Sequence, residues 1–308
     1  MRTLTLIRAG IATTIQDGGR PGHQQHGIPP GGAMDGFAMR IGQHHLGHQS
    51  DEAALEFVYG DLAFTTSDRC RFIVTGAPAA ITIGDSVGHC GKVEETEANA
   101  MVTIKPSEYG LYSYLHVAGG IATPICLGSR STSPRERIGG LDGRYLRDGD
   151  VLPLGEAHTA CPAINTAMPS NRQRQVLSLR FIPGFQYDRF PDATRVDLGS
   201  QIFSVTARAN RMGVTLEGEP VITGMQSLLS EATCYGAIQI PPDGKPIVLL
   251  NDRQTVGGYP KAGAVISSDC QRLAQSRPGQ RVEFVAVTPQ EADRIAWLEH
   301  HYLESKLL

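Results

Sequence analysis

Residues 237–250 read AIQIPPDGKPIVLL. Two short apolar runs, 237–240 and 247–250, stand on either side of a segment that contains Pro241, Pro242, Asp243 and Gly244. Short runs of apolar and β-branched residues bounded by Pro, Asp and Gly are typical of strands joined by turns. The stretch therefore predicts two neighbouring strands.

Similar runs recur along the whole chain. They lie at 4–7, 63–65, 71–75, 80–83, 101–104 and 111–118, and again at 176–182, 202–207, 214–216, 264–266 and 282–287. The 308 residues include 35 Gly and 19 Pro, more than the usual share of roughly 12%. The sequence therefore predicts a mainly β protein with a few helices.

Three helices are expected among these strands. Residues 34–46 place apolar side chains at helical spacing, and Asp35 suits the positive end of that helix. Ser268 with Gln271 predicts a capping box for a helix that ends near residue 274. Thr288 and Glu291 predict a second capping box, with Pro289 at the first helical position of the last helix.

The segment between the two groups of strands has no clear period and contains Pro153, Pro162 and Pro169. Such composition is typical of a linker. We therefore expect an N-terminal β-rich subdomain at 1–155, a linker at 156–175 and a C-terminal β-rich subdomain at 176–308.

Composition excludes several classes of function. The net charge of −3 gives no broad basic surface for nucleic acid, and 41% hydrophobic with 19% charged residues is ordinary for a soluble protein. Six cysteines without a CxxC pair indicate reduced thiols, so we expect a cytoplasmic location. Arg8 interrupts the first apolar run, so it does not read as a signal peptide, and His116 and Pro124 interrupt the one long uncharged stretch, so we expect no membrane segment.

Familiar signatures of chemistry are missing. The sequence has no GxxxxGK loop, no GxGxxG after a strand, no GxSxG and no segment of the Ala-Met-Lys-Met type for biotin attachment. His44, His45 and His48 resemble a metal-binding helix, but a zincin helix has a Glu after its first His. Histidines at a helix C-terminus more often interact with its negative end.

Two polar segments are candidate sites. Residues 14–22 contain Asp17, Arg20 and three glycines, which suits either an anion-binding loop or a structural turn in which Asp17 pairs with Arg20. Residues 239–261 gather many ionisable and amide groups after the 247–250 strand, which suits a ligand site or a hydrogen-bonded loop closing a barrel. A third, arginine-rich segment at 128–150 is balanced by acidic residues and is expected to be a self-paired surface.

Several segments together, in this order, resemble a known family. They are TTIQDGGR (13–20), GAMD (32–35), AALE (53–56), VAGGI (117–121), LGSRST (127–132), GGLDGR (139–144), NRMG (210–213), GAIQ (236–239), PIVLL (246–250), and DRQT (252–255) through GYPK (258–261). The chain resembles the allophanate hydrolase subunit 2, or biotin-dependent carboxyltransferase, family, whose stand-alone bacterial members include the C subunit of 5-oxoprolinase. Gly31 stands where relatives often carry Ser.

The resemblance implies a fold and a function. It implies two β-rich subdomains, the second a cyclophilin-like barrel. It also implies a partner, the B subunit, from the allophanate hydrolase subunit 1 family, together with a further A subunit. The function implied is ATP-dependent 5-oxoprolinase, in which the B and C subunits phosphorylate the cyclic amide before it is opened to L-glutamate. ATP with Mg²⁺ would be shared with the partner.

The resemblance also allows two alternatives. One is the carboxyltransferase part of a biotin-dependent urea or amide carboxylase, whose biotin-bearing domains would have to come from partners. The other is a non-catalytic regulator of a kinase inhibitor, which would need only a binding surface.

Residue types then suggest roles for the side chains in these motifs. Arg253, Lys261 and Arg20 are expected to supply positive charge to a phosphoryl group, and Asp252 or Asp17 to hold Mg²⁺. The predicted catalytic residues are Asp252, Arg253 and Lys261, and the predicted binding residues are Asp17, Arg20, Arg211, Gln239, Thr255, Gly257 and Gly258.

Overall fold

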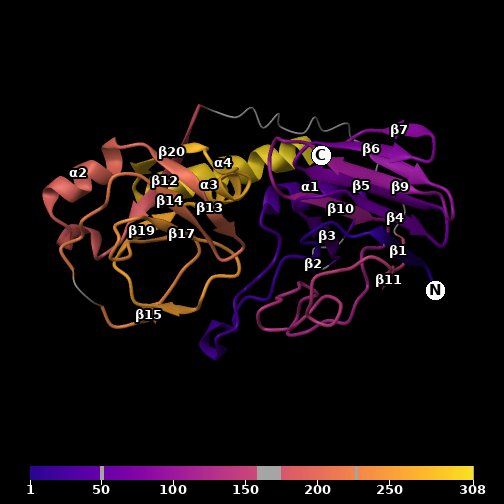
Figure 1. The fold of residues 1–308 in the computed structure, drawn as a ribbon, viewed down its shortest axis with the longest axis horizontal. Helices are drawn as coiled ribbons and strands as arrows, with labels where there is room; N and C mark the ends of the chain where they lie inside the picture. Colours follow the sequence, from indigo (N-terminus) through magenta and orange to yellow (C-terminus); the bar gives the residue numbers. More distant parts are fainter. Residues whose placement is uncertain (49–51, 158–174, 226–227, 308) are drawn as a thin grey trace. The chain divides into compact units, whose positions relative to one another are not determined.

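The computed structural model describes residues 1–48, 52–157, 175–225 and 228–307 (Figure 1). Apart from the last two residues, the chain forms two compact units, Met1–Pro21 with Pro30–Asn171, and Gly22–Pro29 with Arg172–Lys306. The predicted linker falls almost wholly on 158–174, outside the described residues, so its structure stays a prediction.

The first unit contains two antiparallel sheets. The six-stranded sheet runs β11 (Val151–Pro153), β1 (Thr3–Arg8), β4 (Leu62–Thr66), β9 (Val102–Pro106), β6 (Ala79–Ile83) and β7 (Ser86–Gly88). The five-stranded sheet runs β2 (Thr14–Gln16), β3 (Ala54–Phe57), β10 (Ser113–Val117), β5 (Cys70–Gly76) and β8 (Val93–Thr96).

One hydrophobic core joins these sheets, because each strand turns alternate side chains toward the other sheet. Leu4 and Leu6 of β1 and Leu115 and Val117 of β10 belong to this core and are fully buried. Phe64 of β4 and the β5 residue Phe72 meet edge to face, with ring centroids 5.6 Å apart. The first unit is therefore a β-sandwich.

Helix α1 (Gly36–His45) packs on β5 and β10 of the five-stranded sheet. The carboxylate of Asp35 caps it by accepting a hydrogen bond from the Ala38 N–H at 3.0 Å. The expected helix is confirmed, with Asp35 serving as its N-cap rather than lying inside it.

The second unit is a closed barrel of seven strands. Around the barrel they run β12 (Val176–Pro183), β19 (Lys261–Val265), β16 (Ala237–Gln239), β17 (Ile247–Leu249), β14 (Gly213–Glu217), β13 (Phe203–Asn210) and β20 (Arg281–Ala286). The parallel pairing of β12 with β20 completes the ring. β15 (Glu231–Ala232) and β18 (Val256–Gly257) form a separate two-stranded ribbon that is not part of the barrel sheet.

Aromatic rings fill part of the barrel core. The Phe284 ring packs against those of Phe181 and Phe203, with centroids 5.9 and 5.5 Å apart, and all three side chains are buried. The expected architecture, mainly β with two β-rich parts and a C-terminal barrel, is confirmed.

The other helices are α2 (Asp192–Ser200), α3 (Ser267–Ala274) and α4 (Pro289–Leu307), with 3₁₀ turns η1 (Gln24–His26) and η2 (Tyr187–Arg189). The Thr288 capping box of α4 is confirmed, since the Glu291 N–H donates to Thr288 Oγ1 at 3.2 Å and the Thr288 N–H donates to the Glu291 carboxylate at 2.7 Å. The expected box at Ser268 is wrong, because α3 begins at Ser267 and its N-cap, Ile266, has no side-chain cap.

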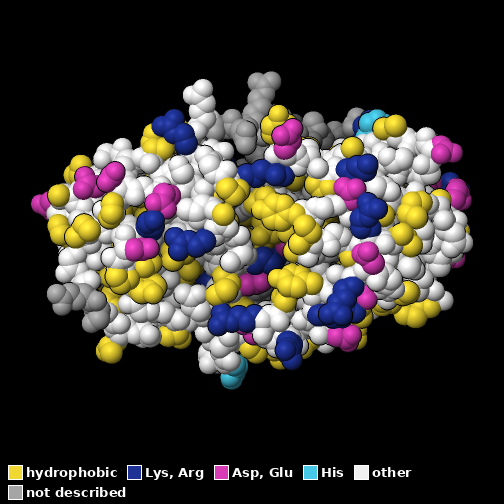
Figure 2. All heavy atoms as spheres, in the orientation of Figure 1, with side chains coloured by type: hydrophobic (Ala, Val, Ile, Leu, Met, Phe, Trp, Pro, Cys, Tyr) yellow, Lys and Arg dark blue, Asp and Glu magenta, His cyan; other side chains and the backbone are white. Residues whose placement is uncertain are grey.

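The surface carries charges of both signs. Figure 2 shows Lys and Arg side chains interspersed with Asp and Glu over the visible face, which fits the small net charge. Within the described ranges, no helix is both long enough and apolar enough to cross a bilayer.

Candidate functional site

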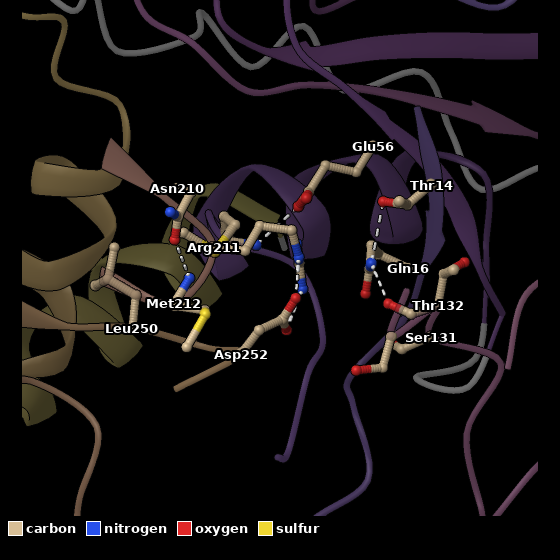
Figure 3. A network of polar contacts seen from close by, with 12 residues as sticks. Thr14, Gln16, Glu56, Ser131, Thr132, Asn210, Arg211, Met212, Leu250 and Asp252 are labelled. Carbon is tan, nitrogen blue, oxygen red and sulfur yellow. Dashed lines mark hydrogen bonds and ion pairs between the residues drawn. The ribbon is translucent and has the colours of Figure 1, made fainter. Parts of the chain in front are cut away.

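The segment after β17 presents Asp252 to Arg211. Arg211 lies in the turn between β13 and β14, and the Asp252 N–H donates to its carbonyl oxygen at 2.8 Å. The guanidinium donates from Nε to Asp252 Oδ2 at 2.7 Å and from Nη2 to Oδ1 at 2.9 Å (Figure 3). Two parallel bonds of this kind fix both groups in orientation. Both oxygens of Asp252 therefore accept from Arg211.

Lys261 belongs to a second group of polar side chains. It begins β19 directly opposite Gln239, which ends β16. Its Nζ lies 2.6 Å from Glu231 Oε1, and Gln186 Nε2 donates to the same oxygen at 2.6 Å. The Lys261 N–H donates to Gln186 Oε1 at 2.7 Å. Glu231, which no sequence motif indicated, is thus the counter-ion of the predicted Lys261.

Gln239 is the most buried member of this group, with 1% of its surface exposed. Its Oε1 accepts from Gln254 Nε2 at 3.3 Å, whereas its Nε2 has no hydrogen-bond partner among the described residues. A Cβ at Gly257 would lie 2.8 Å from that Nε2, so only glycine at this position packs against the amide without displacing it. We name Gln186, Glu231, Gln239, Gln254, Gly257 and Lys261 the Lys261 cluster.

Thr255 and Gly258 support the neighbouring loop. The Thr255 carbonyl oxygen accepts from the Thr233 N–H at 3.0 Å, and the Thr233 hydroxyl donates to the Gln254 carbonyl oxygen. A Cβ at Gly258 would lie 3.2 Å from the Leu228 carbonyl oxygen. The described contact of Thr255 is therefore through its backbone, and Gly258 allows two loops to approach closely.

Arg253 makes different contacts from its neighbour Asp252. Its Nη1 donates to the Leu250 carbonyl oxygen at 3.2 Å, and its guanidinium carbon lies 5.9 Å from the centre of the Tyr235 ring. The side chain is buried, and burial lowers the pKa of the guanidinium below its usual range. Within the described part of the chain Arg253 has no carboxylate partner, and its contacts are with the Leu250 carbonyl oxygen and the Tyr235 ring, whereas Lys261 pairs with Glu231.

Asp17, in the first unit, is surrounded by donors. It is 3% exposed, and Oδ1 accepts from the Gly19 N–H at 2.8 Å and from the hydroxyls of Ser129 and Ser131, both at 2.6 Å. Its Oδ2 accepts from the Arg130 N–H at 2.6 Å. We name these residues the Asp17 network. It ties the 129–131 segment to β2, as a structural turn does.

Arg20 has a similar structural setting. It is 1% exposed, and its guanidinium donates to the carbonyl oxygens of Cys126, at 3.4 Å from Nε, and of Ser131. Gly139 has φ +70°, and a Cβ there would collide with the Ser131 carbonyl oxygen and lie 2.6 Å from Arg20 Nη2. Arg20 therefore holds the same segment that the Asp17 network holds.

The residues proposed for Mg²⁺ make contacts that do not suit a metal site. Both Asp17 oxygens accept from protein N–H or O–H groups, and both Asp252 oxygens accept from Arg211. Across the described ranges, no group of three His, Cys, Asp or Glu side chains is arranged to hold a metal ion. The arginine-rich segment is partly self-paired as expected, since Arg144 makes two 2.8 Å bonds to Asp150.

The five-stranded sheet carries a buried polar face whose residues were not among the predicted site residues. Tyr114 Oη donates to Glu56 at 2.8 Å, and burial followed by the Glu56 charge raises the pKa of Tyr114 well above its usual range. Gln16 donates to Thr14 Oγ1 at 3.0 Å and to the Thr132 carbonyl oxygen at 3.1 Å (Figure 3). A sequence signal for this face is the alternation of polar and apolar residues in 14–16 and 114–117, together with the lone Glu56 in an apolar run.

His116 belongs to the same polar face. It is fully buried, its Nε2 lies 3.3 Å from Thr75 Oγ1, and burial lowers the pKa of the imidazole well below its usual range, with His48 and His45 adding to the effect. A Cβ at Gly42 of α1 would collide with the imidazole. His116 is therefore a neutral packing residue beneath α1.

Comparison with known proteins identifies the family of this chain. The family model described as "Carboxyltransferase domain, subdomain A and B" matches residues 26–286. The chain belongs to this carboxyltransferase domain family. The resemblance seen in its motifs is thereby confirmed.

Two curated relatives match along nearly their whole length. The C subunit of 5-oxoprolinase from Escherichia coli is 37% identical over 305 residues, 98% of this chain and 96% of that protein. The protein of the same name from Haemophilus influenzae is 33% identical over 292 residues, 94% of this chain and 93% of that protein.

A solved structure has the same fold. The structure of Kluyveromyces lactis urea carboxylase matches 99% of this chain with a TM-score of 0.91 and 23% identity, and the match covers 29% of that larger chain. At this identity the match shows the fold alone.

Proposed function

We propose that the chain is one component of an ATP-dependent 5-oxoprolinase, acting with a partner of the allophanate hydrolase subunit 1 family. The observation that carries this proposal is the 37% identity to the C subunit of a 5-oxoprolinase across 98% of this chain and 96% of that protein. A match over both full lengths supports the function of the whole relative, whereas the urea carboxylase match supports only a shared fold.

The chemistry accounts for why a partner is needed. An amide carbon is a poor electrophile, and transfer of the ATP γ-phosphoryl group to the amide oxygen turns that oxygen into part of a phosphate leaving group. ADP leaves when the bond between its terminal oxygen and the transferred phosphorus breaks. Such a reaction depends on positioning and charge stabilisation. Because Asp17 and Asp252 already accept from protein donors, we assign the nucleotide and its Mg²⁺ to the partner.

The contribution of this chain is then to position the amide substrate. Lys261 and Gln239 offer donors on the β16–β19 side of the barrel, and the Arg211–Asp252 pair fixes the neighbouring loop. Arg253 stabilises that loop from within through the Leu250 carbonyl oxygen and the Tyr235 ring.

The test is to co-express the chain with the proteins encoded beside it and to measure ATP hydrolysis that depends on 5-oxoproline. We expect turnover by the assembly and none by the chain alone. Turnover by the isolated chain, or an assembly without 5-oxoproline-dependent hydrolysis, contradicts the proposal.

A second candidate is a carboxyltransferase component that receives CO₂ from carboxybiotin, favoured by the family model that matches residues 26–286. The same preparation distinguishes the two. Product formation that requires biotin and bicarbonate supports the carboxyltransferase, and product formation without them excludes it.

A further inference from the structure

The Lys261 cluster has hydrogen-bonding groups that the described protein does not use. Gln239 Nε2 is buried and has no partner among the described residues. A buried amide nitrogen without a partner is costly, since its desolvation is not compensated. Lys261 Nζ can donate three hydrogen bonds, and the structure shows one, to Glu231 Oε1. The cluster therefore offers donors to a ligand.

The cluster also offers an acceptor. Glu231 Oε1 receives bonds from both Lys261 and Gln186, while no described residue donates to Oε2 of the same carboxylate. The Glu231 side chain is 35% exposed and that of Lys261 13%, compared with 1% for Gln239. The polar groups thus run from solvent at Glu231 to the buried amide of Gln239.

These side chains are placed around one another by strand pairing. Gln239 is opposite Lys261 in the barrel, and Glu231 is opposite Gly257 in the β15–β18 ribbon. The Lys261–Glu231 ion pair links barrel and ribbon, and Gly257 faces Gln239 Nε2. These four contacts form a ring, so the unused donors and the unused acceptor belong to one site.

The charge of this site selects the class of ligand. Glu231 neutralises Lys261, so an anionic group gains little from the ammonium and is repelled by the carboxylate. A neutral carboxamide fits both kinds of partner, because its oxygen accepts and its N–H donates. We propose that the Lys261 cluster binds the carboxamide of a small substrate, with Gln239 Nε2 and Lys261 Nζ donating to the oxygen and Glu231 Oε2 accepting from the N–H.

This assignment rests on the proposed function only for the identity of the amide, which would be the lactam ring of 5-oxoproline. Urea presents the same pair of groups. The carboxylate of 5-oxoproline is on the carbon next to the N–H, so in this arrangement it points away from Glu231 and is not bound by the Lys261 cluster. The anion-binding role expected for Lys261 from its residue type is replaced by binding of a neutral carbonyl oxygen.

The first experiment measures binding of neutral probes to the full chain by ligand-observed NMR titration. We expect 2-pyrrolidinone to bind and N-methyl-2-pyrrolidinone, which lacks the N–H, to bind roughly tenfold more weakly, the loss of one hydrogen bond to a charged acceptor. Acetate and phosphate should not displace 2-pyrrolidinone. Equal binding of the two lactams, or displacement by acetate, overturns the proposal.

Amino-acid substitutions test whether 2-pyrrolidinone binds at the Lys261 cluster. Gly257→Ala places a methyl group 2.8 Å from Gln239 Nε2 and should weaken 2-pyrrolidinone binding about tenfold. Gln239→Leu should have a similar effect. Gln275→Leu removes another buried glutamine, at the end of α3, and serves as the control that should bind normally. If Gln239→Leu does not fold, Gly257→Ala alone decides, and normal binding by Gly257→Ala overturns the proposal.

The two proposals can fail separately. One outcome is that lactam binding depends on Gly257 but the assembly shows no 5-oxoproline-dependent ATP hydrolysis. This outcome supports the carboxamide site and contradicts the 5-oxoprolinase proposal. A titration with urea then tests whether urea, which has the same carbonyl and N–H groups, is the ligand instead. The opposite outcome is an active assembly whose KM for 5-oxoproline is unchanged by Gly257→Ala. It contradicts the carboxamide site and leaves the 5-oxoprolinase proposal intact.

Discussion

The Asp17 network and the Lys261 cluster look alike in the sequence, as polar residues beside glycines, but their hydrogen bonding differs. Both Asp17 oxygens accept from protein N–H and O–H groups that join two segments of the sandwich. In the Lys261 cluster a buried donor, Gln239 Nε2, has no partner among the described residues. We infer that a fully bonded network supports the fold, whereas an incompletely bonded one is suited to a ligand.

The largest effect is expected from removing the centre of the Asp17 network. Asp17→Ala leaves two hydroxyls and two backbone N–H groups without their acceptor in a buried place. We expect a loss of about 3 kcal/mol or more in the free energy of unfolding, because each buried donor left unsatisfied costs about 1–3 kcal/mol. Urea denaturation measures it, and the exposed Asp85→Ala is the control. A loss below that of the control would show that the network is not structural.

Substitution of Gly139 tests the same network, because Gly139 packs against the backbone of Ser131. Gly139 and Gly149 both have positive φ, +70° and +87°, but a Cβ collides with Ser131 at the first and meets nothing within 4 Å at the second. Gly149→Ala should cost about 1 kcal/mol for conformation alone. Gly139→Ala should cost at least ~2 kcal/mol, because a collision with backbone adds to that strain. Equal thermal unfolding midpoints for the two variants would contradict this account.

The pH dependence of stability follows from His116 in the first unit. Its pKa is lowered in the folded protein, so the unfolded chain takes up a proton first as the pH falls. A histidine in the unfolded chain has a pKa of about 6.5. The stability contributed by neutral His116 is present at pH values above this pKa and is lost as the pH falls below it. The slope from this group should approach ~1.4 kcal/mol per pH unit.

The measurement is the free energy of unfolding between pH 7 and pH 5. His116→Gln should flatten the curve, while the exposed His26→Gln should leave its slope unchanged. A slope that survives in His116→Gln would assign the pH dependence to another group.

The smallest effect on stability is expected in the Lys261 cluster. Lys261→Met leaves behind Glu231, which is 35% exposed and keeps its hydrogen bond from Gln186, so we expect a loss of only about 1 kcal/mol. The same variant should weaken 2-pyrrolidinone binding, because one donor to the carbonyl oxygen is gone. A loss of stability comparable to that of Asp17→Ala, with lactam binding intact, would reverse the roles of the two regions.

Much of the fold follows from short-range sequence signals. Apolar runs bounded by Gly and Pro predict strands such as β5, β12 and β17, and Thr288 with Glu291 predicts the start of α4. The three-residue β2 and the four-residue β3 are too short for their hydrophobic pattern to be distinguished from that of a loop. Their strand character depends on pairing with each other, which is a long-range contact.

The Ser268 capping box shows how a tertiary contact overrides a local pattern. Asp269, in the first turn of α3, is fully buried and accepts from Arg180 at 2.7 Å through both carboxylate oxygens. Arg180 lies on β12, so this ion pair fixes the start of the helix from another element. Nothing in the local sequence around Ser268 specifies that partner.

The candidate site was only partly predictable for the same reason. The apolar pattern places Gln239 in a predicted strand, but the strand predicted at 264–266 begins in the structure at Lys261, and only the register brings Lys261 opposite Gln239. Glu231 lies on a two-residue strand without a motif of its own, so only the folded ribbon identifies it as the partner of Lys261. Arg253 is adjacent to Asp252 in sequence, yet the turn directs its guanidinium to the Tyr235 ring.

The most direct test of the central claim is the KM for 5-oxoproline of the assembled enzyme carrying Gly257→Ala. We predict a KM raised about tenfold, with the unfolding midpoint of the chain unchanged, because the added methyl group lies 2.8 Å from the unused amide of Gln239. An unchanged KM in a folded, active assembly would contradict the carboxamide site.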